Sequence, residues 1–131
     1  MIKQFIYLPA YKWKLFVFYW AERKDADEIL QALQRFGAQE ETLATAETNL
    51  RGRSINTGLT YTNESSRATI IVISACSSPE EFWNTLDHEK GHAAQHIGRA
   101  LDLDYTSESQ QYLAGAIGGK MYSVAKRFLC S

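Results

Sequence analysis

The sequence predicts an α+β fold in a single small domain, and three observations support this expectation. The chain has 131 residues, about the size of one domain, with 45% hydrophobic and 22% charged residues. Some segments carry the β-branched and aromatic patterns of strands, and others repeat apolar residues at helical spacing. We expect a short, mostly antiparallel sheet of about three strands packed against two long helices, with one or two further helices in the N-terminal half.

The N-terminal half contains one predicted strand and two predicted helices. Residues Tyr11–Trp20 are dense in aromatic and β-branched side chains, and lysines alternate with apolar residues where the segment begins, as in a strand. Residues Asp25–Phe36 repeat apolar side chains at helical spacing, and Asp25 is the candidate N-cap. Residues Glu40–Leu50 form a weaker predicted helix that ends near Gly52.

The C-terminal half is predicted to contain two strands followed by two long helices. Residues Gly58–Thr62 have the composition of a short strand, and Asn63–Arg67 form a polar turn. Residues Ala68–Ser74 are the strongest predicted strand, and their continuous apolar run indicates burial on both faces. Helices are then expected over Pro79–Arg99 and Glu108–Leu129.

The first of these long helices has a clear start signal. Ser78 is the predicted N-cap, and Pro79 suits the first helical position because its fixed φ is helical and its missing N–H is not needed there. Glu81 stands three residues after Ser78, as in a capping box.

Charge and hydropathy exclude two broad classes of protein. The formal net charge is −1, so no basic field marks a nucleic-acid binder. No stretch approaches the roughly 18 uncharged apolar residues of a membrane span. The apolar segment Met1–Trp20 is interrupted by Lys12 and Lys14 and does not resemble a signal peptide, so we expect a cytoplasmic protein.

The two cysteines, Cys76 and Cys130, do not form a disulfide framework or a zinc-finger pattern. We expect free thiols, and a bridge between the two stays open.

One short motif carries a definite chemistry. Residues His88 to His92 read His-Glu-Lys-Gly-His, the pattern H-E-x-x-H. In a helix the two histidines lie one turn apart on the same face, where both can bind one Zn²⁺. Glu89 is rotated by about 100° from His88, so it is free to take a proton from a zinc-bound water.

A helical wheel shows how this helix is expected to pack. At about 100° per residue, His88, His92 and His96 fall in one polar sector. Phe82, Leu86, Ala93, Ile97 and Ala100 cluster roughly opposite. We therefore expect an apolar back against the sheet and a polar front that lines a cleft.

A catalytic zinc usually has three protein ligands, so a third is needed. We rank Glu108 first, Asp104 second and Asp102 third, because each follows the helix and can fold back toward it. On a straight helix His88 and His96 would be about 12 Å apart at their bases. We therefore expect His96 to support the site or to form part of the cleft wall, with ligation less favoured.

The histidine motif, followed by Glu108-Ser109-Gln110-Gln111-Tyr112-Leu113-Ala114-Gly115, resembles the gluzincin metallopeptidases. The resemblance covers residues 68 to 126. It implies a zincin-like single domain, a glutamate ligand on a separate helix, and Glu89 as general base and acid. The chain does not resemble metzincins, although Asp102 and Asp104 keep an aspzincin arrangement open. Residues before about 65 match no family.

The expected function is therefore zinc-dependent hydrolysis of a peptide or protein substrate. An additional donor to the oxyanion is expected, with Tyr112 the first candidate and Tyr105 or Tyr122 the alternatives. An extended substrate could pair with the edge of the Gly58–Thr62 strand. Two other classes stay open: a non-catalytic protein with a structural or vestigial metal site, and a metal-free interaction protein that uses the histidines as a surface.

Overall fold

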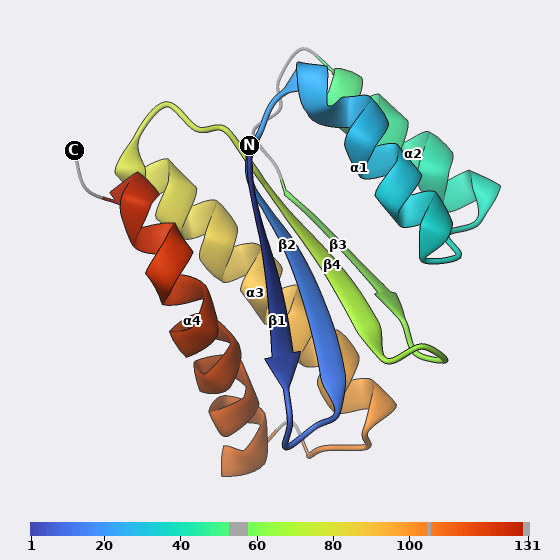
Figure 1. The fold of residues 1–131 in the computed structure, drawn as a ribbon. Coiled ribbons are helices and arrows are strands. Elements are labelled where there is room, and N and C mark those ends of the chain that lie inside the picture. Colours follow the sequence, from blue (N-terminus) through green and yellow to red (C-terminus); the bar gives the residue numbers. More distant parts are fainter. Residues whose placement is uncertain (53–57, 105, 130–131) are drawn as a thin grey trace.

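A computed structural model describes residues 1–52, 58–104 and 106–129. It is a three-layer arrangement in which one sheet lies between two pairs of helices (Figure 1). The elements, in chain order, are β1 (Ile2–Leu8), β2 (Trp13–Ala21), a short 3-10 helix (Arg23–Asp25), α1 (Ala26–Arg35), α2 (Glu40–Arg51), β3 (Leu59–Asn63), β4 (Ala68–Ser74), α3 (Pro79–Ala100) and α4 (Glu108–Leu129).

The sheet has four strands in the order β1-β2-β4-β3. The pairs β1–β2 and β3–β4 are antiparallel, whereas β2 and β4 are parallel. A parallel pair needs a long connection between its strands, and here α1, α2 and β3 lie in that connection. This order leaves β3 at one edge of the sheet.

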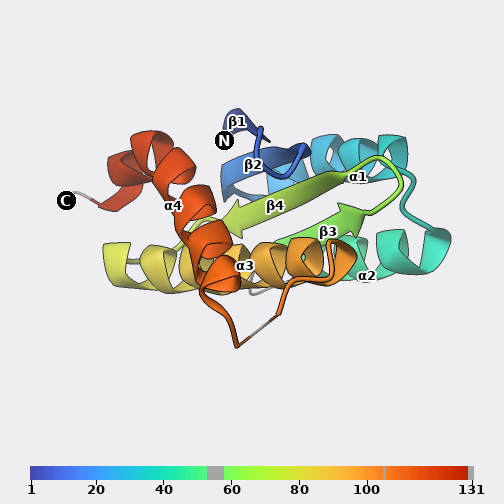
Figure 2. The same cartoon turned by 90° about the horizontal axis from the view of Figure 1, so that it is seen from below.

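Each face of the sheet is covered by one helix pair (Figure 2). Phe18, Ile70 and Val72 belong to the core that contains the buried residues of α1 and α2. Val17 and Ile71 belong to the core on the side of α3 and α4. The central strands are therefore buried on both faces, as the apolar run of β4 predicted. In the described ranges, no helix is long and apolar enough to cross a membrane.

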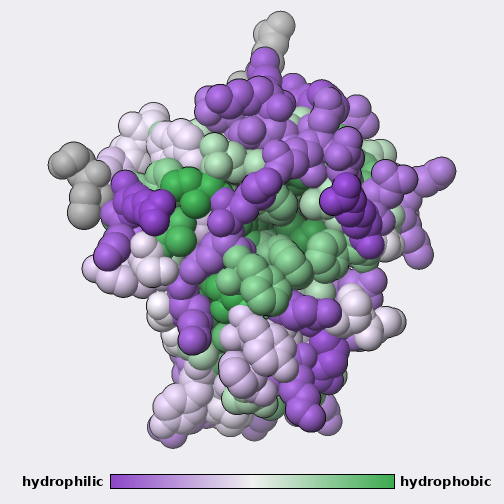
Figure 3. All heavy atoms as spheres, viewed as in Figure 1, coloured by the Kyte–Doolittle hydropathy of each residue, from purple (hydrophilic) through white to green (hydrophobic). Residues whose placement is uncertain are grey.

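The expected sheet lacked one strand, because β1 was not predicted. Two of the three strand pairings are antiparallel, as expected of a mostly antiparallel sheet, and the central pairing of β2 with β4 is parallel. Strand β1 alternates buried Ile6 and Leu8 with Phe5 and Tyr7, which are 58% and 46% exposed. Figure 3, in the same view as Figure 1, shows apolar surface gathered over this part of the sheet. A turn follows Leu8 and separates β1 from β2 within the apolar segment Met1–Trp20.

The caps of two helices differ in how well the sequence predicted them. Asp25 does not cap α1, because its carboxylate accepts a hydrogen bond from the Glu22 backbone N–H at 2.9 Å, within the preceding 3-10 turn. The Ser78 cap of α3 is confirmed, since its hydroxyl accepts from the Glu81 N–H at 3.2 Å. The Glu81 carboxylate accepts from Ser77 rather than from Ser78, and these bonds lower its pKa.

We expect Ser78→Ala to lower the free energy of unfolding by about 1 kcal/mol, because one amide at the start of α3 loses its acceptor. Urea denaturation followed by circular dichroism measures the change. Ser78→Asp is the matched control, since its carboxylate can accept the same bond, and it should keep most of the stability. Equal stability of Ser78→Ala and the natural chain would contradict the role of this cap.

Candidate metal and active site

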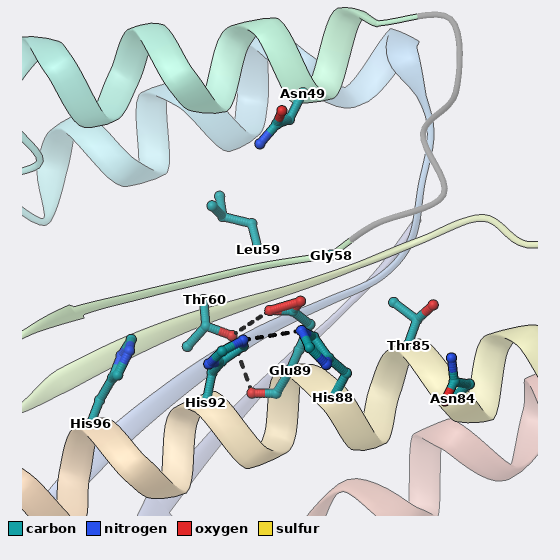
Figure 4. Close-up of a pocket in the computed structure, with 10 residues that line it drawn as sticks. All are labelled: Asn49, Gly58, Leu59, Thr60, Asn84, Thr85, His88, Glu89, His92 and His96. Atoms are coloured by element: carbon teal, nitrogen blue, oxygen red, sulfur yellow. Dashed lines mark hydrogen bonds between the residues drawn. The ribbon is translucent and has the colours of Figure 1, made fainter.

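A cleft of about 700 Å³ opens along the free edge of β3, between α2 and α3. Asn49 contributes from α2, Leu59 and Thr60 contribute from β3, and the histidines contribute from α3 (Figure 4). Two elements that are distant in sequence from α3, namely α2 and β3, therefore line the cleft that the motif faces.

Helix α3 presents the histidines to this cleft because its opposite side is apolar. Phe82, Leu86, Ala93 and Ile97 are all buried in the core beneath the sheet. This burial fixes the rotation of the helix about its axis. The amphipathic pattern predicted from the sequence is confirmed.

The two motif histidines converge on each other. The Nε2 atoms of His88 and His92 are 3.1 Å apart, and the two rings are nearly perpendicular at 87°, with centroids separated by 4.6 Å. Two nitrogens bound to one tetrahedral zinc at its usual distance are about 3.3 Å apart. At 3.1 Å one imidazole can also donate a hydrogen bond to the other, and the separation is close enough to this spacing for the pair to hold a shared zinc ion.

Glu89 lies beside the histidines at the wall of the cleft and is only 5% exposed. The Thr60 Oγ1 atom is 2.9 Å from Glu89 Oε1 and 3.1 Å from the Glu89 backbone carbonyl oxygen, so one hydroxyl proton serves both acceptors. A Cβ atom at Gly58 would lie 2.4 Å from Glu89 Cγ. The absence of a side chain at Gly58 therefore lets β3 approach Glu89 closely.

Glu108 is not brought to the histidines. Helix α4 packs on the flank of α3 that carries Ala94 and Gly98: Gln110 Nε2 donates to the Ala94 carbonyl at 2.9 Å, and only a glycine at position 98 leaves room for its amide. On the helical wheel Ala94 lies about 160° from His92. Glu108 begins this same helix and is exposed to solvent.

The two aspartates ranked after Glu108 lie in the exposed loop that follows α3. Asp104 accepts bonds from the Thr106 backbone N–H at 2.9 Å and from its hydroxyl at 2.8 Å, which lower the Asp104 pKa. Asp102 has a φ of 58° in the turn that ends the helix. Within the part of the chain that the structure describes, no three His, Cys, Asp or Glu side chains form a group that could hold a metal ion.

The tyrosines expected as oxyanion donors are also placed away from the cleft. Tyr112 and Tyr122 are 68% and 60% exposed on α4, and neither lines the cleft. Tyr105, and Cys130 as a partner for Cys76, lie outside the described residues.

His96 does line the cleft, one turn beyond His92. Its Nδ1 atom lies 2.9 Å from Thr62 Oγ1, and its ring centroid is 6.2 Å from that of His92. Burial lowers the pKa of His96, and the neighbouring charges of His92 and Arg99 lower it further. The neutral imidazole is therefore favoured.

Sequence reasoning did not identify the threonines of β3 as part of the site. The segment Leu-Thr-Tyr-Thr alternates, and period-two geometry places Thr60 and Thr62 on one face of the strand. That signal was available. Which face turns toward α3 depends on the pairing of β3 with β4, which the sequence did not reveal.

The chain matches no family model, no curated protein and no solved structure.

Proposed function

We propose that this protein is a zincin-like, zinc-dependent metallopeptidase that hydrolyses peptide bonds. The observation that carries the proposal is the convergence of the His88 and His92 Nε2 atoms, 3.1 Å apart, beside a buried Glu89 in an open cleft. A purely structural metal site has no use for a general base next to its ligands.

A zinc ion held by His88 and His92 would polarise the scissile carbonyl and make a water molecule acidic. Glu89 takes a proton from the attacking water molecule as the water oxygen forms its bond to the carbonyl carbon. Glu89 then delivers that proton to the amine nitrogen as the C–N bond breaks, so the carboxylate is regenerated. Thr60 holds one carboxylate oxygen in place throughout.

The proposed substrate is an extended segment of peptide. Strand β3 is an edge of the sheet and lines the cleft, so its outer backbone groups can pair with an added strand. Such pairing depends on the peptide backbone rather than on side chains, so we expect the enzyme to have little preference for the sequence of its peptide or protein substrate.

Zinc binding tests the metal site. We expect zinc at about 1,000 times its dissociation constant to raise the melting temperature by about 10–15 °C. His92→Ala should abolish the shift, whereas Gln95→Ala, an exposed change on the same helix, should keep it. Glu108→Gln should leave the zinc affinity unchanged, because α4 packs on the flank of α3 away from the histidines, and a loss of affinity would show that Glu108 is the third ligand that the family resemblance implies. No bound metal and no shift in the natural chain would overturn the proposal.

A non-catalytic metal-binding protein is the second candidate. It is favoured by the fact that, among the described side chains, no third ligand joins the histidine pair. Zinc binding is common to both candidates, and the Glu89 substitution argued in the Discussion separates them.

A further inference from the structure

A chain of hydrogen bonds crosses the sheet and ends on His96. Trp13 Nε1 donates to Thr69 Oγ1 at 2.9 Å, Thr69 Oγ1 lies 2.8 Å from Thr62 Oγ1, and Thr62 Oγ1 lies 2.9 Å from His96 Nδ1. Thr62 and Thr69 are direct partners in the β3–β4 register, so the sheet itself sets this spacing. Trp13 and Thr69 are fully buried.

The direction of the chain follows from counting protons. The indole of Trp13 is a donor only, so Thr69 must accept from it. Thr69 then has one hydroxyl proton, and the acceptor that the described structure offers it is Thr62. If Thr62 donated to Thr69 instead, the buried Thr69 proton would have no partner, which is costly. Thr69 therefore donates to Thr62.

The same count sets the tautomer of His96. Thr62 accepts from Thr69, and the acceptor that the described structure offers for the single Thr62 hydroxyl proton is His96 Nδ1. An Nδ1 atom that accepts a hydrogen bond carries no proton, so the proton of the neutral ring is on Nε2. An Nε2–H group is a donor and offers no lone pair to a metal.

The position of His96 determines which group of a bound substrate its Nε2–H can contact. His96 lies four residues, about 6 Å, beyond His92 along α3. An extended peptide advances about 6.8 Å in two residues. If a peptide lies along the cleft with its scissile bond at the His88–His92 pair, a main-chain carbonyl about two residues away passes His96.

We propose that His96 is a substrate-binding residue whose Nε2–H, set by the Trp13–Thr69–Thr62 chain, donates to a main-chain carbonyl of an extended peptide about two residues from the scissile bond. His96 is then not the third zinc ligand. This assignment rests on the proposed peptidase function for its substrate, but the tautomer and the metal affinity can be measured without any activity.

The tautomer is measured by long-range ¹H–¹⁵N correlation spectra of the histidine rings at a pH where His96 is neutral. We expect the Nε2–H form in the natural chain and in Thr62→Ser, which keeps the hydroxyl. Thr62→Val, which keeps the shape but lacks the donor, should give a mixture of both forms. An Nδ1–H tautomer in the natural chain would overturn the assignment.

Zinc affinity provides the second measurement. His96→Ala should leave the zinc dissociation constant within about threefold of the natural value, because the proposed Nε2–H offers no lone pair to the metal. A loss comparable to that of His92→Ala would show that His96 is a ligand.

Kinetics and peptide titration provide the third measurement. With unfolded casein, we expect His96→Ala to raise KM about tenfold with little change in kcat, since one ground-state hydrogen bond is lost. Hydrolysis of a dipeptide amide, too short to reach His96, should not change. Equal effects on both substrates would contradict the carbonyl contact.

If the natural chain hydrolyses neither substrate, the proposed peptidase function fails, but the role assigned to His96 can still be tested. Casein peptides titrated into the natural chain then decide the matter, because a carbonyl bound at His96 must move its Nε2 resonance. An unmoved resonance at saturating peptide would refute the contact.

Discussion

Glu89→Gln is expected to lower peptide hydrolysis by about 10³-fold while zinc affinity stays close to that of the natural chain. Glutamine has the shape of glutamate and its amide oxygen can still accept from Thr60, so the wall of the cleft is kept. It cannot take a proton from water at neutral pH. The loss is therefore specific to proton transfer.

The measurement combines hydrolysis of unfolded casein with metal content after dialysis. Asp87→Asn is the matched control, because Asp87 is an exposed neighbour in the motif helix whose carboxylate pairs with Lys90 at 3.2 Å. That variant should keep nearly full activity. Equal hydrolysis by the natural chain and Glu89→Gln would remove the enzyme proposal and leave the non-catalytic metal protein.

Phe82→Ala is expected to cost about 3–5 kcal/mol of folding free energy, the largest effect on stability that we predict. Phe82 is fully buried on the apolar back of α3, where its ring lies 4.9 Å from that of Phe128 and 5.8 Å from that of Trp20. Its removal leaves a cavity where α3, α4 and the sheet meet. Because small domains have about 5–15 kcal/mol in total, the variant should be close to unfolding.

Trp83→Ala provides the comparison for Phe82→Ala within the same helical turn. Trp83 is 50% exposed, so its truncation should cost less than about 1 kcal/mol despite its larger ring. Guanidinium denaturation of both variants measures the difference. Similar costs at the two positions would show that α3 is rotated differently from the orientation that points its histidines into the cleft.

Local sequence patterns were sufficient to predict those helices and strands that are specified by their own residues. The start of α3, its Ser78 cap and its two faces were predicted, and its end was predicted to within one residue, because helical periodicity and capping depend on residues within one or two turns. The apolar run of β4 likewise predicted a strand buried on both faces.

The topology of the sheet was not predictable in the same way. The parallel pairing of β2 with β4 joins residues more than fifty positions apart, and the order of strands depends on which helix pair covers which face. Strand β1 carries a weaker pattern, since Phe5 and Tyr7 point outward and obscure the alternation of polar and apolar residues.

The sequence by itself determined the histidine pair and Glu89, because residues one and four positions apart on a helix have a geometry that no other element can change. Only the tertiary structure decided what surrounds them. The docking of α4 on the far flank of α3 separates Glu108 and Tyr112 from the histidines, and the edge position of β3 brings Thr60 and Thr62 to Glu89 and His96. Those contacts come from long-range packing, in which burial of the apolar faces chooses how the elements meet.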